Sequence, residues 1–399
     1  MQPAERLQQV LRPVIPELGA LVRQTPGTLS LAQGMVSWGP PAQVRELLAQ
    51  TLADPGSDLD VYGPLAGDPA LLETLTAALA AEGLDLEGAD LWVTAGSNMG
   101  FNAIAQVLCD GPPAEPSEVI LPLPYYFNHV MAIQLAGGVA VPVEAGLVPD
   151  PEHLAAAITP RTRAIVTVSP NNPSGVVIPP AVLAAINRLC ASRGLLHISD
   201  EAYGQFVYGA QPHLSPASLP GAAAHTVTLQ SLSKAYGMAG WRVGFLVAPA
   251  AFSAALAKVQ DTVLICPPRL IQRAALAALR AGPAWCAPRI AALAERRTQL
   301  LAAVERSRDQ GLPVQLLAEP DGAFYALLAV DPAAAAAAGL SGAALMRRLV
   351  LEHLVAAVGG ESFGYPANQP VLRLSYGLLG PAELEQALGR LLDGIRALL

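Results

Sequence analysis

Hydrophobic positions between about residues 91 and 249 form short β-branched runs that alternate with longer Ala/Leu-rich segments. The first pair is a run at 91–94, typical of a strand, and a segment at 97–109 whose apolar side chains recur at helical spacing. Further apolar runs predict strands at 118–121, 139–143, 163–168, 195–199, 226–229 and 243–247. Strands that alternate with helices predict a mostly parallel sheet with helices on both faces.

The two ends of the chain have a different pattern. Residues up to about 50 are rich in proline and only partly helical, whereas long Ala/Leu/Arg helical patterns begin near residue 281. Two strand-like pieces, 323–330 and 371–375, interrupt the latter, and an amphipathic helix begins at Pro381. We therefore predict an α/β protein with a large domain at 51–280, a small domain at 281–399, and an N-terminal arm at 1–50 that joins the small domain.

The composition is unusually apolar, with 52% hydrophobic and 14% charged residues, against about 25% charged residues on average. A membrane span needs roughly 18 consecutive apolar residues, and the longest small-residue run, Ala333–Ala338, is far shorter. Residues 1–28 contain several prolines and no continuous apolar stretch, so no signal peptide is expected. These features favour a cytoplasmic protein that buries apolar surface between subunits.

Charge and cysteine spacing exclude further classes of protein. The net charge is −8 and the pI is about 5.3, whereas nucleic-acid-binding proteins usually have a basic face. The four cysteines form no CxxC pair, so neither a zinc site nor a redox motif is expected. We predict no metal, nucleic-acid partner or membrane partner.

A single lysine, Lys234, follows the predicted strand at 226–229 within a segment rich in hydroxyl groups and glycines. A lysine at a strand end in a dry pocket can lose its charge and become a nucleophile toward an aldehyde. Ser231, Ser233 and Arg242 are suited to binding a phosphate. Taken alone, Lys234 is more simply explained as a surface lysine in a Ser/Gly-rich loop.

Other predicted strand ends carry polar groups as well. Asp200 follows the strand at 195–199, where a carboxylate faces the ligand crevice of a parallel sheet and can keep a pyridine nitrogen protonated. Tyr203 and Asn172 are suited to donating hydrogen bonds to a phenolic oxygen of the same ring. Ser97 and Asn98 open a predicted helix, whose first amides can bind phosphate. Singly, Asp200 also fits a helix cap, and Asn172 an ordinary Asn-Pro turn.

The segments SPNNPSG, SDEAY and SLSKAYGMAGWRVG occur in this order along the chain. In this combination, from about residue 30 to residue 377, the chain resembles fold-type I pyridoxal-phosphate (PLP) enzymes of the class I/II aminotransferase family. The resemblance implies a homodimer in which Lys234 forms a Schiff base with the cofactor and shuttles a proton. It implies that Asp200 partners the pyridine nitrogen and that Tyr203 and Asn172 partner the ring oxygen. It also implies a phosphate site made by Ser97, Asn98, Ser231, Ser233 and Arg242.

The same resemblance assigns roles outside these segments. Tyr126 would stack on the cofactor ring, and His129 would support Asp200. Tyr62 would reach the phosphate in the neighbouring subunit. Arg373 would bind the substrate carboxylate, with Asn172, Gly34 and Trp38 also lining the substrate site.

The expected reaction is transfer of an amino group to a 2-oxo acid. No second arginine is obvious for a distal carboxylate, so an apolar or aromatic donor is favoured: methionine, phenylalanine, tyrosine or tryptophan. The segments AQGMVSW and PYYFNH resemble those of plant-type aromatic/methionine aminotransferases.

Other readings of the sequence remain open. A PLP lyase or cyclising synthase would share Lys234, Asp200 and Arg242. A PLP-sensing regulator would need a DNA-binding domain, for which the motifs beginning near residue 30 leave no room. A nucleotide-binding protein lacks support, because neither GxGxxG nor GxxxxGK[ST] occurs in the required context.

Overall fold

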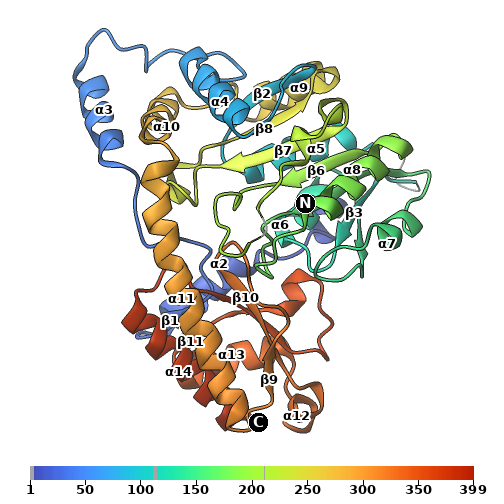
Figure 1. Ribbon diagram of the computed structural model, residues 1–399, viewed down its shortest axis with the longest axis vertical. Helices are drawn as coiled ribbons and strands as arrows, with labels where there is room; N and C mark the ends of the chain where they lie inside the picture. The colour runs from blue at the N-terminus through green and yellow to red at the C-terminus, as the bar shows by residue number, and fades with distance from the viewer. Residues whose placement is uncertain (1–3, 111–114, 211) are drawn as a thin grey trace.

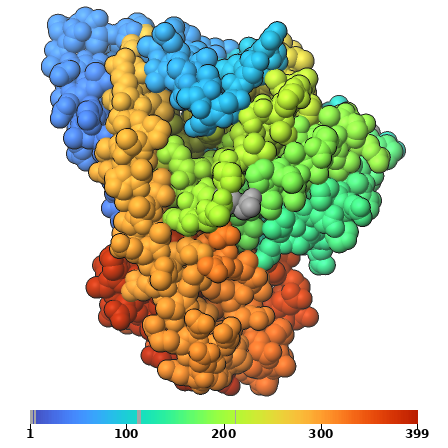
Figure 2. Space-filling model, in the orientation of Figure 1, coloured from blue at the N-terminus to red at the C-terminus, as the bar shows by residue number. Residues whose placement is uncertain are grey.

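The computed structural model describes residues 4–110, 115–210 and 212–399, and it has a large upper part and a smaller lower part (Figure 1). The long helix α11 (Pro283–Asp309) runs from one part into the other. Figure 2 shows the same two masses in space-filling form, with α11 in light orange lying along both.

The large part is built on a sheet that has seven strands within the described residues, in the order β2-β8-β7-β6-β5-β3-β4. Only β8 runs antiparallel to its neighbours there, and the other pairings are parallel. The predicted α/β class with a mostly parallel sheet is therefore confirmed. The strands are β2 (Ala89–Thr94), β3 (Glu118–Pro122), β4 (Val139–Val143), β5 (Thr162–Val168), β6 (Leu196–Asp200), β7 (Thr226–Ser231) and β8 (Gly244–Pro249).

Successive side chains of these strands point to opposite faces of the sheet, and both faces are covered by helices. Val166 packs in a cluster with Phe101 of α5 (Ser97–Leu108) on one face. Its neighbour Ile165 packs with Ile186 of α8 (Pro180–Arg193) on the other face. Further helices of this part are α4 (Pro69–Ala81), α6 (Phe127–Leu135), α7 (Pro151–Ala156), α9 (Ser253–Val263) and α10 (Arg269–Ala281), with short 3₁₀ turns at Pro216–Ser218, Ala222–Ala224, Ala239–Trp241 and Ala250–Phe252.

The small part combines both ends of the chain. Strand β1 (Leu29–Ser30) pairs in parallel with β11 (Val355–Ala356). An antiparallel sheet has the order β12-β13-β10-β9, from Val358–Gly359, Val371–Ser375, Tyr325–Val330 and Val314–Leu316. Further helices of this part are α2 (Val14–Gln24), α12 (Pro332–Ala337), α13 (Gly342–His353) and α14 (Pro381–Leu398), with a 3₁₀ turn at Gly360–Phe363, whereas α1 (Glu5–Gln8) contacts α6 of the large part.

The expected domain boundary at residue 50 falls inside α3 (Ala42–Ala53), which packs against α10 of the large part. We propose a boundary before α3 instead, because a packed helix moves with the element that it covers. Within the described residues, no helix combines the length and the apolar character needed to cross a bilayer.

Candidate active site

A cavity of about 190 Å³ opens where the central parallel strands end. Strands β5, β6 and β7 finish at Val168, Asp200 and Ser231, and all three residues line it. The carboxyl ends of parallel strands meet at one edge of a sheet, which is the usual place for a ligand. Its lining comprises Ser97, Asn98, Tyr126, Asn128, Val168, Asn172, Asp200, Ala202, Tyr203, Ser231, Ser233, Lys234 and Arg242.

Lys234 extends into this cavity from the loop after β7. Its Nζ donates a hydrogen bond to the carbonyl oxygen of Gly34 at 2.6 Å. Burial, together with the positive charges of Arg373 and Arg242, lowers the pKa of Lys234 to about 8, while Asp200 opposes the shift. The amine is therefore neutral far more often than that of an ordinary lysine.

Asp200 lies at the end of β6 with 5% of its surface exposed. Its Oδ2 is 3.0 Å from Nε2 of His129, and its Oδ1 accepts a hydrogen bond from the amide of Ala202 at 3.2 Å. The ring of Phe101 stacks on His129 with centroids 4.0 Å apart. Asp200 does not cap a helix, since the described residues that follow it form turns. The structure thus brings His129 and Asp200 together, and the supporting role of His129 stays a prediction.

The opposite end of the cavity is suited to a phosphate. The hydroxyl groups of Ser231 and Ser233 are hydrogen-bonded at 2.8 Å, and Arg242 donates to the carbonyl oxygen of Ala95 at 3.2 Å. Gly96 has φ +84° and precedes α5, and a methyl group there would lie 2.5 Å from the Arg242 guanidinium. No side chain caps the first turn of α5, so hydroxyls, guanidinium and helix amides can together hold a dianion.

Arg373 is buried in β13 and has only 2% of its surface exposed. It donates to Oδ1 of Asn172 at 2.9 Å and to the carbonyl oxygen of Ala32 at 2.6 Å. Its Nε has no hydrogen-bond partner among the described residues. A buried guanidinium with a free donor and no carboxylate partner is suited to binding an anionic ligand. Because Asn172 accepts through Oδ1, its amide hydrogens remain available as donors.

Of the remaining predicted residues, some lie at or next to the cavity and one lies away from it. Gly34 accepts a hydrogen bond from Lys234, and Trp38 donates to the carbonyl oxygen of the next residue, Ala235, at 3.0 Å, but neither Gly34 nor Trp38 is part of the cavity lining. Tyr126 accepts a hydrogen bond from Asn128 at 2.7 Å. Tyr62 is not brought to this cavity and is 79% exposed. Its expected role toward a neighbouring subunit stays a prediction.

The sequence reasoning missed Tyr325 and Asn128. The hydroxyl of Tyr325 is 2.7 Å from that of Tyr203, and its ring lies under the Arg373 guanidinium at 4.6 Å. Tyr325 stands in an apolar strand, so its pattern is that of a core residue. For Asn128, the feature of the sequence that could have indicated a place in the site is its position two residues after Tyr126.

Pyridoxal phosphate is the cofactor that these groups fit. A lysine of lowered pKa, a buried carboxylate and a phosphate-binding turn converge on one cavity at the strand ends of an α/β sheet, which defines a fold-type I PLP enzyme. The family described as "Aminotransferase class I and II" matches residues 26–391. The chain belongs to this family and is a PLP-dependent aminotransferase, as its motifs predicted.

Its relatives act on different amino acids according to their names. The chain is 32% identical to the aromatic aminotransferase ISS1 of Arabidopsis thaliana, over 97% of this chain and 94% of that protein. It is 37% identical to the arginine–pyruvate transaminase AruH of Pseudomonas aeruginosa, over 75% and 73%. The solved structure of aspartate aminotransferase from Thermus thermophilus with maleate is 31% identical, with a TM-score of 0.86 over 99% of this chain and 100% of that one. The names of these relatives thus share one family and differ in the amino-acid donor.

Proposed function

We propose that this aminotransferase takes the amino group from an apolar or aromatic amino acid: methionine, phenylalanine, tyrosine or tryptophan. The supporting observation is the surroundings of Arg373. The rings of Tyr325 and Phe363 lie 4.6 and 5.2 Å from its guanidinium, and the lining of the adjoining cavity includes no cations besides Lys234 and Arg242. When the carboxylate of a substrate amino acid is bound to Arg373, the side chain of that substrate contacts aromatic rings and not a second positive charge.

In this proposal the residues of the site divide the steps of the reaction among them. When bound, pyridoxal phosphate supplies an electron-withdrawing ring that accepts the electrons released at the substrate α-carbon. Arg373 binds the substrate carboxylate, and Nζ of Lys234 takes up and returns the α-proton. Asp200, supported by His129, keeps a positive charge on the ring nitrogen. Tyr126 packs against the ring, while Asn172 and Tyr203 donate to its oxygen.

The phosphate is assigned to the opposite end of the cavity. Ser231, Ser233, Arg242 and the amides of Ser97 and Asn98 would hold it. Since this end lies on a helix N-terminus and on hydroxyl groups, it fixes the cofactor without taking part in proton transfer.

The lowered pKa of Lys234 predicts how the apoenzyme captures its cofactor. Only the neutral amine attacks an aldehyde, and the neutral fraction grows as the pH rises through the pKa, which is about 8. The rate of appearance of the yellow holoenzyme should therefore rise with a midpoint near pH 8 and level off above it. Stopped-flow absorbance between about pH 6 and pH 10 measures this profile. A midpoint near that of an ordinary lysine, about 10.4, would contradict it.

A half-reaction tests the donor class. Purified holoenzyme is mixed with one amino acid at a time, without a 2-oxo acid, and the loss of its visible absorption band is followed. Aromatic donors and methionine should convert the cofactor at least about tenfold faster than aspartate or arginine, since a hydrophobic site discriminates by roughly this factor or more. Faster conversion by aspartate or arginine would refute the donor class. Continuous 2-oxo acid release without an acceptor would indicate a lyase.

We also propose that the protein works as a cytoplasmic homodimer. The loop that carries Tyr62 exposes apolar side chains, with Val61 61% and Tyr62 79% exposed, and Ile265 nearby is 46% exposed. The amide of Gly63 and Sγ of Cys266 are 3.4 Å apart, so these side chains belong to one surface. Measuring the mass of the purified protein in solution tests the dimer.

A further inference from the structure

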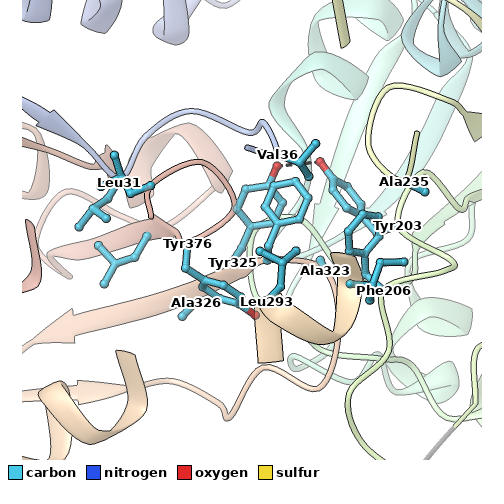
Figure 3. Packing of buried hydrophobic residues seen from close by; sticks show 14 of the residues in the cluster. Leu31, Val36, Tyr203, Phe206, Ala235, Leu293, Ala323, Tyr325, Ala326 and Tyr376 are labelled. Atoms are coloured by element: carbon cyan, nitrogen blue, oxygen red, sulfur yellow. Dashed lines mark hydrogen bonds between the residues drawn. The ribbon is translucent and has the colours of Figure 1, made fainter. Parts of the chain in front are cut away.

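Tyr325 begins strand β10 and is buried, with 1% of its surface exposed. Its hydroxyl is 2.7 Å from the hydroxyl of Tyr203, and the two rings are nearly perpendicular at 79°. Figure 3 shows the two hydroxyls pointing toward one another beside Val36. The residue assigned to the cofactor ring oxygen therefore has a second tyrosine at its hydroxyl.

The ring of Tyr325 also supports the residue assigned to the substrate carboxylate. The guanidinium carbon of Arg373 lies 4.6 Å from the ring centroid, a distance at which a buried cation is attracted to the aromatic face. A methyl group at Gly34 would lie 2.5 Å from the Tyr325 hydroxyl, and the carbonyl of Gly34 accepts from Lys234. Tyr325 thus contacts three groups of the site: Arg373, Tyr203 and Gly34, whose carbonyl oxygen accepts from Lys234.

The direction of the bond between the two hydroxyls follows from counting protons. A phenol has one proton to donate and also accepts. If Tyr203 donates its proton to the cofactor, the proton in the bond between the tyrosines must come from Tyr325. Among the described residues, the hydroxyl of Tyr203 is the hydrogen-bond partner of the Tyr325 hydroxyl. Burial raises the pKa of both phenols, so both keep their protons at neutral pH.

We propose that Tyr325 is a positioning residue that donates its hydroxyl proton to Tyr203, so that Tyr203 donates to the cofactor ring oxygen, while its ring holds Arg373 in place. This inference rests on the proposed roles of Tyr203 and Arg373. It adds a residue that links cofactor electronics to substrate binding. Chains of hydrogen bonds strengthen one another in a buried site, so removing the first donor weakens the second.

The charged and titratable groups around this pair set the background for a pH measurement. Tyr126 and Arg373 both act electrostatically on Tyr203, and Lys234 lies 5.8 Å from its ring. Phe206 and Phe324 pack on the remaining sides and carry no charge. A change confined to the Tyr325 hydroxyl leaves all of these groups in place.

The test is a spectral pH titration of the holoenzyme, which needs no substrate. A donor to the ring oxygen favours its anionic form and so lowers the pH midpoint of the cofactor's visible absorption change. Tyr325→Phe should raise this midpoint by about 0.5 to 1 pH unit, the effect of one ordinary hydrogen bond. Tyr208→Phe is the matched control, because its hydroxyl donates to the carbonyl of Ala323 at 2.6 Å, and its midpoint should equal the parent's.

Two further variants separate the hydroxyl from the ring. Once Tyr203→Phe has removed the acceptor, adding Tyr325→Phe should not move the midpoint again. Tyr325→Leu should also raise KM for the amino acid roughly tenfold by removing the ring under Arg373, whereas Tyr325→Phe should leave KM nearly unchanged. Thermal unfolding of each apoenzyme shows whether the fold is kept.

An unchanged midpoint in Tyr325→Phe, an equal shift in Tyr208→Phe, or additive shifts in the double variant would overturn the inference. If the proposed class of amino-acid substrate is wrong, the half-reaction of the parent enzyme shows it. The spectral titration contains no substrate, so its result does not depend on that proposal.

Discussion

Replacing Lys234 with alanine is expected to abolish measurable amino transfer and the visible absorption band of the holoenzyme. Lys234 is the nucleophile that attaches the cofactor and the base that moves the substrate proton, and loss of the second task alone typically costs about 10²–10⁴-fold. Turnover with an aromatic donor and the absorption spectrum after mixing with pyridoxal phosphate measure both effects. The phosphate site stays intact, so weak cofactor binding without the band should persist.

The chain provides an unusually clean control for this variant. It has two lysines, Lys234 and Lys258, and Lys258 is exposed on α9 outside the cavity. Lys258→Ala should keep the parent spectrum and rate, and borohydride reduction should fix the cofactor on the peptide containing Lys234. Cofactor on the Lys258 peptide, or full activity in Lys234→Ala, would refute the assignment.

Replacing Asp200 with asparagine should retain the cofactor but lower kcat by roughly 100-fold or more, in the range seen when one preorganised electrostatic contact is removed. Asparagine keeps the shape of the side chain, yet it cannot supply the negative charge that holds a proton on the ring nitrogen. Without that proton the ring accepts electrons poorly. Single-turnover rates measured per bound cofactor separate this loss from weaker binding.

Glu201→Gln is the matched control, because it neutralises the next residue along the chain. Glu201 is also buried, at 3% exposed, but its carboxylate accepts from Ser215 at 2.8 Å and does not line the cavity. Its rate per folded, cofactor-bound molecule should remain close to the parent's. Equal losses in the two variants would show that a buried charge, rather than a ring-nitrogen partner, was removed.

Local pattern was sufficient for most elements. The strands expected at 139–143 and 371–375 match β4 and β13, since a short apolar run with clear ends has few alternatives. Differences occur at element ends: the helix expected to 109 stops at Leu108, and the strand expected from 323 begins at Tyr325. Ends depend on which backbone groups find partners, and those partners lie elsewhere in the chain.

The residues of the site also include some that the sequence predicted and some that it did not. Asp200 and Ser231 end neighbouring strands, β6 and β7, which pair in parallel, so their place at one edge of the sheet follows from the order of motifs along the chain. Tyr325 was missed because a tyrosine in an apolar strand has the same pattern whether it is core or site. The sequence predicted a boundary at residue 50 because nothing in α3 indicates that it packs against α10, and the contact between these helices is the basis for our proposed boundary before α3.

The sequence by itself determined the α/β class, the family, the cofactor and the residues at the strand ends, because these depend on periodicity and on short segments of fixed chemistry. Only the tertiary structure decided how Arg373 meets Asn172, 201 residues away, and how Tyr325 meets Tyr203, 122 residues away. Such contacts depend on how the small part packs against the large one. Packing is a property of the whole chain, so no local pattern of residues encodes it.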